Sequence, residues 1–247
     1  MTTVLRLAGP LLAWPAPARF RDRPTNRVPT FAAVTGLISA AAGIRRNDQR
    51  PAWISNLRAA FRIDQPGSVL RDFHSINPRP ARPYAWMSPD DFKEYVQPTL
   101  LKAHGAAHLQ PHLSTRHYMQ DQAVVAFVDD PTGNITEALT NPRFTLYAGR
   151  KSCLLAWPFL LGTTSLPIPD AARTVKTRDT GHRPPSTLEV IYTYDPEDPA
   201  ARAWTDPGAN PAGPVGTTYT DRPMWSTLVP HPGTGPSWLD IAKDLPT

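Results

Sequence analysis

The most concentrated chemistry in the chain is a run of arginines that leads directly into a helical pattern. Four arginines lie between positions 19 and 27. A helix is predicted to begin after Thr30, a good N-cap residue, and to end near Gly43, which suits the left-handed conformation. Backbone N–H groups in the first turn, together with the arginines, favour an anion, and RNA is the candidate polyanion. The alternative is a solvated loop that precedes an ordinary core helix.

Two further stretches combine basic residues with features that suit nucleic acid. In residues 77–86, two arginines alternate with prolines ahead of Tyr84 and Trp86. Exposed aromatic rings stack on unpaired bases and contribute about 1–3 kcal/mol per base, although an ordinary proline-rich loop has the same composition. Residues 147–152 contain one glycine and two basic residues, and they resemble an anion-holding turn.

Charge is unevenly distributed along the 247 residues. Residues 1–150 carry 18 Lys and Arg against 11 Asp and Glu, whereas residues 151–247 carry 8 against 10, within a net charge of +5. The basic residues are 21 arginines and 5 lysines. The planar arginine fork pairs with phosphate and stacks on bases, so this bias favours RNA as the partner of the N-terminal part.

The composition also excludes other classes of protein. A single cysteine, Cys153, excludes an internal disulfide and a thiolate zinc site and fits a reducing compartment. We find no apolar stretch long enough to span a membrane and no signal-peptide pattern, so we expect a cytoplasmic protein. Four histidines between positions 104 and 117 have near-helical spacing, but a glycine and a proline interrupt the helix. We therefore expect no metal and no cofactor.

An enzyme is the main alternative to a binding protein. His74, Tyr84 and Lys93 are a general base, an acid and a cation that lie near one another in the sequence. A metal-independent ribonuclease requires groups of this kind. The chain contains no G-x-S-x-G motif and no Walker loop.

Short elements must position these residues, because 30 prolines oppose a long helical bundle. In the strand predicted at residues 68–74, Arg71 and Phe73 are expected to share one face. The pattern also predicts strands at residues 3–7 and 123–128, short helices at 51–61 and 135–139, and, in a β-rich part beyond residue 167, strands at 187–194 and 224–229 with a long loop at 207–216.

Several short motifs, in their order and spacing, resemble the CasD family of the type I-E CRISPR surveillance complex Cascade, which is the Cas-five family, subtype e, of the RAMP superfamily. The N-terminal matches are Leu5-Arg6-Leu7-Ala8-Gly9-Pro10, Ala13-Trp14, Arg23-Pro24-Thr25, Pro29-Thr30, Gly36-Leu37 and Gly43-Ile44 with Arg46. The later matches are Arg71-Asp72-Phe73-His74, Arg116-His117-Tyr118 with Asp121, and Tyr147 to Cys153. The resemblance covers about residues 3–160, and its departures at Ala148 and Leu154-Leu155 bear on packing rather than charge.

The resemblance implies an α+β fold. Its N-terminal domain, residues 1–160, would be a ferredoxin-like, RRM-related RNA-binding domain whose second core strand contains residues 71–74. A thumb hairpin would be inserted at about residues 77–117, before the third core strand. A smaller β-rich region would follow at residues 161–247.

The resemblance also implies a function. Relatives of this kind bind the 5′ handle of the guide RNA (crRNA) without catalysis and cap the filament of Cascade backbone subunits. The expected partners are therefore the crRNA handle, the backbone subunits, the large subunit and, through the complex, target DNA, with no membrane. A related family in another subtype cuts its own repeat RNA, so a metal-independent endoribonuclease stays the alternative.

Residue chemistry and the resemblance together give a predicted set of RNA-binding residues. They lie in the arginine-rich loop and after its helix, in the predicted strand and thumb, and in the glycine turn. The set is Arg23, Thr25, Arg27, Arg45, Arg46, Arg71, His74, Arg79, Arg82, Tyr84, Trp86, Arg116, Tyr147, Gly149, Arg150, Lys151 and Ser152.

Overall fold

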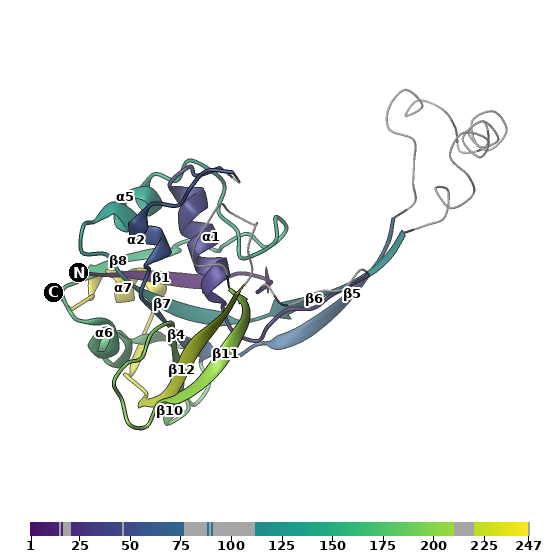
Figure 1. Cartoon of the computed structure of the whole chain (residues 1–247). Coiled ribbons are helices and arrows are strands. Elements are labelled where there is room, and N and C mark those ends of the chain that lie inside the picture. The colour runs from purple at the N-terminus through teal and green to yellow at the C-terminus, as the bar shows by residue number, and fades with distance from the viewer. Residues whose placement is uncertain are drawn as a thin grey trace. The chain divides into compact units, whose positions relative to one another are not determined.

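In the described part of the chain, seven strands form one antiparallel sheet, within a mixed α+β architecture (Figure 1). The structure is a computed structural model, and it describes residues 1–14, 16, 21–45, 47–76, 88, 90, 112–209 and 220–246. The strand order is β11-β12-β10-β4-β7-β1-β8. The bounds are β1 Thr2–Ala8, β4 Ala59–Gln65, β7 Ala123–Asp129, β8 Leu160–Thr164, β10 Thr187–Tyr192, β11 Arg202–Ala209 and β12 Thr220–Pro230.

Four strands and two helices of the N-terminal part follow one another in the order β1-α1-β4-β7-α5-β8. The helices are α1 (Phe31–Ala41) and α5 (Asn134–Thr140). In the sheet, β1 lies between β7 and β8, and β4 pairs with the other edge of β7, with every pairing antiparallel. Both helices cover the same face of the sheet, where they contact each other.

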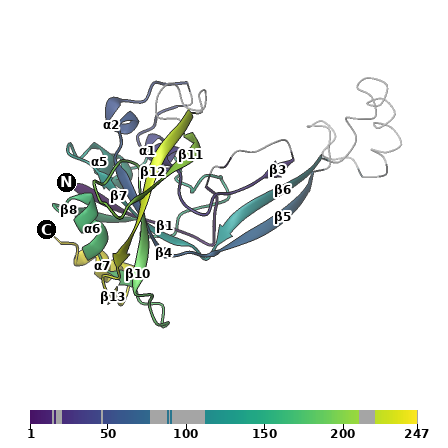
Figure 2. The same cartoon turned by 60° about the horizontal axis from the view of Figure 1, so that its bottom comes forward.

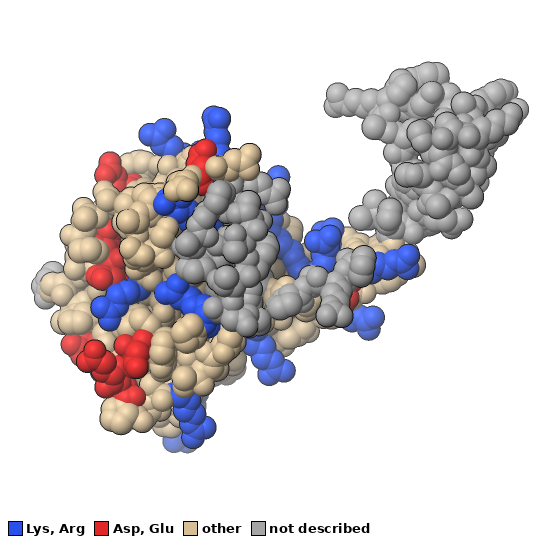
Figure 3. Space-filling model, viewed as in Figure 1, with Lys and Arg blue, Asp and Glu red and all other residues tan. Residues whose placement is uncertain are grey.

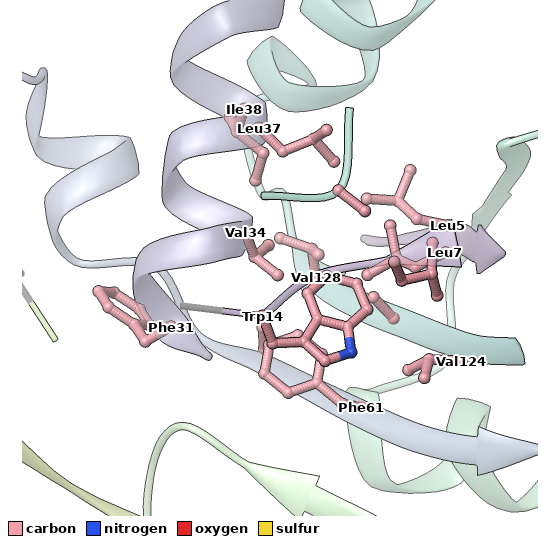
Figure 4. Packing of buried hydrophobic residues seen from close by; sticks show 14 of the residues in the cluster. Leu5, Leu7, Trp14, Phe31, Val34, Leu37, Ile38, Phe61, Val124 and Val128 are labelled. Carbon is pink, nitrogen blue, oxygen red and sulfur yellow. The ribbon is translucent and has the colours of Figure 1, made fainter. Parts of the chain in front are cut away.

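Alternating apolar residues give the sheet two buried faces. Leu5 and Leu7 of β1 pack beneath α1 and α5, while Val4 points to the opposite face. On that opposite face the sheet is covered by α6 (Ile168–Thr174) and α7 (Trp238–Lys243). In Figure 4, Val34, Leu37 and Ile38 of α1 face the core residues of the sheet and of the segment after β2, which include Leu5, Leu7, Trp14, Phe61, Val124 and Val128. The predicted strands at residues 3–7 and 123–128 are confirmed as β1 and β7.

Helix α1 has the predicted ends, and its N-cap is covered by other parts of the chain. Thr30 Oγ1 accepts a hydrogen bond from the backbone N–H of Ala33 at 3.2 Å, and Gly43 has φ +77°. Thr30 and Phe31 are nevertheless buried, and the Arg222 guanidinium lies over the Phe31 ring at 3.7 Å. The cap is thus covered within the chain, whereas Ala32 and Ala33 of the same turn are half-buried.

The predicted helix at residues 51–61 is wrong in its second half. Helix α2 is only Ala52–Ser55, and Phe61 lies in β4, a strand in the middle of the sheet. Strand β4 is buried on both faces, so its sequence lacks the alternation that marks a half-exposed strand. It also occupies the position between core helix and third strand that the resemblance gave to residues 71–74.

The chain separates into two compact units. Unit 1 is residues 1–17, 24–70 and 117–247, and unit 2 is residues 18–23 and 71–116. This division does not follow the predicted boundary at residue 160, because β10 pairs with β4 and β12 pairs with β10 in one sheet. The predicted strands at residues 187–194 and 224–229 and the helix at 135–139 are present as β10, β12 and α5.

The remaining elements are short strands and one long strand pair. Strands β5 (Ser68–Ile76) and β6 (His112–Gln120) pair with each other (Figure 2). Within unit 2, β3 (Asp22–Arg23) runs parallel to β6, and within unit 1, β2 (Leu11–Leu12) pairs with β6. Strands β9 (Thr177–Arg178) and β13 (Thr234–Gly235) form a parallel pair. The predicted loop at 207–216 begins inside β11, and residues 210–219 lie outside the described residues. Among the helices described, none has the length and apolarity to cross a membrane.

Candidate nucleic-acid interface

The glycine turn at residues 147–154 is held closed by its own backbone. Ala148 donates its N–H to the Cys153 carbonyl at 2.8 Å, and Cys153 donates to the Arg150 carbonyl at 2.8 Å. The Cys153 thiol is buried, and this burial raises its pKa. The turn therefore presents Lys151 and Ser152, both exposed, on a fixed backbone.

Gly149 is required by a contact within the chain. Its φ is +82°, and a Cβ added there would lie 1.7 Å from the Ala13 carbonyl oxygen. The N–H of Ala13 in turn donates to the Ala148 carbonyl at 3.1 Å. The backbone that approaches Gly149 closely is therefore that of Ala13.

The Arg150 guanidinium binds the protein's own carbonyls. Its terminal nitrogens donate to the carbonyl of His117 at 2.8 Å and to that of Pro24 at 3.3 Å. The same guanidinium lies over the Tyr118 ring at 4.7 Å. Arg150 therefore fastens the glycine turn to the segment that carries Thr25 and to the end of β6, so its role is to position other residues.

Trp14 connects the segment around Thr25 to Gln122 through hydrogen bonds of its backbone and its indole ring. Its backbone N–H donates to Thr25 Oγ1 at 2.8 Å, which engages the hydroxyl predicted to contact phosphate. Its indole Nε1–H donates to Gln122 Oε1 at 2.6 Å, and Gln122 Nε2 donates to the Arg27 carbonyl at 2.6 Å. Gln122 was missed by the sequence analysis, and no pattern around it signals this role.

The structure thus brings together two parts of the predicted site in unit 1, which Ala13 and Trp14 connect. Segments 13–14, 24–27 and 147–152 are joined by the hydrogen bonds described above. The Arg27 and Lys151 side chains are exposed, and neither makes an ion pair with the described residues. Arg45 is also exposed, and Tyr147 is half-buried. Arg27 and Lys151 are therefore exposed cations beside the joined segments.

Unit 2 carries a second set of predicted residues on β3, β5 and β6. Arg71 and Phe73 both point outward from β5, as expected for alternate positions, and Phe73 is 62% exposed. Arg23 of β3 lies opposite Arg116 of β6 in the parallel register. In Figure 3, lysine and arginine side chains, drawn in blue, lie on the surface along the extended strand pair. His74 Nε2 lies 2.5 Å from Asp72 Oδ2 on the same strand.

Part of the predicted site lies outside the described residues. These positions are Arg46, Arg79, Arg82, Tyr84 and Trp86. Of the residues proposed for a ribonuclease, only His74 is described, since Tyr84 and Lys93 also fall outside. Among the described residues, no cluster of three or more metal-binding side chains is found.

Comparison with known proteins gives one consistent result. The family model for CRISPR-associated protein (Cas_Cas5) matches residues 2–211. The Escherichia coli (strain K12) protein CRISPR system Cascade subunit CasD is 31% identical over 185 residues, which are 68% of this chain and 74% of that protein. A chain of a CRISPR RNA-guided surveillance complex matches with a TM-score of 0.71 at 21% identity, over 99% of this chain and 100% of that chain. A crystal structure of a Cas protein matches with a TM-score of 0.65 at 23% identity, over 96% and 100%.

Proposed function

Because the chain belongs to the Cas5 family of CRISPR-associated proteins, we propose that it is the non-catalytic crRNA-binding subunit of a type I-E Cascade complex. In this role it binds the 5′ handle of the guide RNA in the cytoplasm and caps one end of the backbone filament. Its partners are then the handle, the other Cascade subunits and, through the complex, target DNA. The CasD relative supports this proposal, since it is a Cascade subunit and its similarity covers most of both chains.

The strand arrangement supports a ferredoxin-like core within this proposal. The order β1-α1-β4-β7-α5-β8, with β1 between β7 and β8 and with both helices on one face, is the β-α-β-β-α-β arrangement. The pair β5 and β6 is inserted between its second and third strands, β4 and β7. We assign this insertion, including residues 77–117, as the thumb hairpin.

The observation that carries the proposed mechanism is the contrast between engaged and free cations in unit 1. Arg150 is held by two carbonyls, whereas Arg27 and Lys151 are exposed beside the segments that it fastens. Phosphates of the handle would bind Arg27 and Lys151, because charge-assisted contacts to the backbone supply most of the affinity for single-stranded RNA. In unit 2, Arg71 would bind phosphate and Phe73 would stack on an unpaired base.

The proposal is tested by handle binding and by complex assembly. The full chain is titrated into a fluorescently labelled RNA that carries the 5′ handle, and the dissociation constant is followed against salt concentration. Arg27→Ala should weaken binding about threefold to tenfold and reduce the salt slope by about 0.7, because one phosphate contact is lost. Arg202→Ala is the matched control, since Arg202 is an exposed arginine on β11.

The second arm is co-expression with the other Cascade subunits and a guide RNA. The wild-type chain should be recovered in the complex with the handle protected from nuclease. Recovery of the chain without RNA or partner subunits would contradict the proposed function. Equal effects of Arg27→Ala and Arg202→Ala would contradict the assigned site but leave the family assignment intact.

A further inference from the structure

A basic cavity lies in unit 1 on the face of the sheet that α6 and α7 cover. Its volume is about 350 Å³, and its charged and ionisable lining residues are Arg6, Asp64, Asp121, Arg178, His182, Arg183 and His231. Arg6 follows Val4 by two residues in β1, so both face the side opposite α1. The glycine turn packs with the α1 side of the sheet, since Ala148 and Cys153 belong to that core cluster. We propose that this cavity is a second anion site that binds a phosphate group.

Arg6 gives the first argument for an anion. Its NH1 donates to the Trp157 carbonyl at 3.3 Å, and its guanidinium lies 5.2 Å from the centre of the Trp238 ring. Its Nε is buried and has no hydrogen-bond partner among the described residues. Burial lowers the pKa of Arg6, and the positive charge of Arg178 lowers it further. Two cations therefore face each other with a donor left unsatisfied, an arrangement that a bound anion would stabilise.

The acidic side chains of the cavity do not balance this charge. Asp64 is paired with the fully buried Arg62, whose Nε lies 2.6 Å from Asp64 Oδ1. Asp121 is exposed, and no ion pair joins it to an arginine of the cavity within the described residues. Arg178 and Arg183 are exposed and likewise form no ion pair with the described residues. The guanidinium groups of Arg6, Arg178 and Arg183 therefore form no ion pair with a carboxylate among the described residues.

Two histidines also line the cavity. His231 accepts a hydrogen bond at Nδ1 from the Gly233 N–H at 3.1 Å, and its Nε2 lies 3.1 Å from Thr177 Oγ1. Both ring nitrogens of His231 are therefore engaged within the chain. His182 is exposed at the cavity and is free to face an anion.

Phosphate fits this arrangement better than a carboxylate does. Arg6 reaches the cavity from the sheet, whereas Arg178 and Arg183 line it from β9 and the chain beyond it. A phosphate group offers oxygens in several directions and can accept from more than one guanidinium, while a planar carboxylate is satisfied by a single fork. The volume is also at the lower end of the range for small-ligand sites, which suits a mononucleotide or the terminal phosphate of a strand.

The test measures phosphate binding by the full chain in buffer without phosphate or sulfate. The probes are inorganic phosphate, adenosine 5′-monophosphate, and a six-nucleotide RNA with either a 5′-phosphate or a 5′-hydroxyl, each followed by isothermal titration calorimetry. Arg178→Gln and Arg183→Gln should each weaken binding of the phosphate-bearing probe about tenfold, since each removes one charge-assisted contact. Arg202→Gln should leave binding unchanged. Arg178 and Arg183 are both exposed, so their substitution should not impair folding.

The different probes show whether the bound phosphate belongs to a free nucleotide or to the end of an RNA strand. Binding of the nucleotide assigns the site to free nucleotides, and preference for the 5′-phosphorylated RNA assigns it to strand ends. Absence of binding by every phosphate probe, an equal loss in Arg202→Gln, or binding of hexaglutamate in place of phosphate would overturn the inference. Arg27→Ala should reduce handle binding but retain nucleotide binding, so failure of the cavity site is distinguishable from failure of the proposed function.

Discussion

The glycine turn of unit 1 and the β5–β6 pair of unit 2 carry similar residue types but use them differently. In the turn, Arg150 donates to two carbonyls and Gly149 packs against Ala13. On β5, Arg71 and Phe73 are exposed. The polar groups of the turn mostly bind other parts of the chain, whereas the side chains on β5 are exposed to solvent.

This difference shows that residue type alone does not identify a binding residue. Arg150 and Lys151 are neighbours in one predicted anion-binding turn, yet only Lys151 is exposed. The two carbonyl bonds hold the half-buried Arg150 guanidinium in place, whereas the exposed Lys151 ammonium can turn its three donors to a phosphate. We therefore expect substitutions of Gly149 and Arg150 to change stability first, and those of Lys151 and of the exposed β5 residues to change RNA binding first.

The largest effect is expected from Gly149→Ala. The added Cβ would overlap the Ala13 carbonyl, and φ of +82° is strained for alanine. We expect the free energy of unfolding to fall by about 4 kcal/mol, because both the backbone and its neighbour must shift. Urea denaturation followed by circular dichroism measures this loss.

Gly36→Ala is the matched control for that prediction. Gly36 lies inside α1, and a Cβ there would meet nothing within 4 Å. Alanine is the better helix former, so the free energy of unfolding should rise by about 0.5–1 kcal/mol. If both glycine substitutions had the same effect, the packing role of Gly149 would be disproved.

A smaller loss of stability is expected from Arg150→Ala. The substitution removes two hydrogen bonds from a charged donor and its contact with Tyr118, which together contribute about 2–3 kcal/mol. The only cysteine of the chain reports on the turn directly, because the Cys153 thiol is buried. Its labelling by a thiol reagent should be slow in the wild type and faster in Arg150→Ala.

Arg150→Lys distinguishes this positioning role from a simple charge. Lysine keeps the charge but cannot reach two carbonyls with a planar fork. It should therefore recover only part of the lost stability and leave Cys153 more reactive than in the wild type. Full recovery of both by lysine would show that the charge, rather than the fork, matters at this position.

Much of the fold was predictable because its strongest patterns are local. Strand β1 and helix α1 have clear periodicity, and the Thr30 cap marks the beginning of the helix. Strand β4 was missed because Trp53, Ile54, Leu57 and Phe61 happen to fall at helical spacing across a short helix, a turn and a strand. The continuation of the sheet into β10 and β12 depends on pairing across more than 120 residues, for which the sequence contains no local signal.

The contacts that hold the candidate site together could not be predicted. The glycine turn and the segment around Thr25 lie together in the structure. The partners of Arg150 are 33 and 126 residues away, so the sequence could not show that its donors are occupied. The role of Gln122 could not be predicted from the sequence either, because its three hydrogen bonds join it to distant segments.

On β5, Phe73→Ala should leave stability unchanged and weaken RNA binding. The ring is 62% exposed, so its removal should change the free energy of unfolding by less than about 0.5 kcal/mol. Loss of one stacked base should weaken handle binding about tenfold. Phe144→Ala is the matched control, since Phe144 is 46% exposed in unit 1 and has no proposed contact with RNA. If Phe73→Ala lowered stability without weakening RNA binding, Phe73 would be a structural residue and not a binding residue of β5.

The smallest effect, and the sharpest test of the contrast inside the turn, is expected from Lys151→Ala. Lys151 is exposed next to Arg150, so its removal should leave both the urea midpoint and the Cys153 labelling rate unchanged. Handle binding should weaken about threefold, and the salt slope should fall by about 0.7, because one phosphate contact to a single strand is lost. Lys243→Ala, at an exposed lysine of α7, provides the control for a general change of charge. If Lys151→Ala instead accelerated Cys153 labelling, the lysine would share the positioning role of Arg150, and the turn would have no free cation of its own.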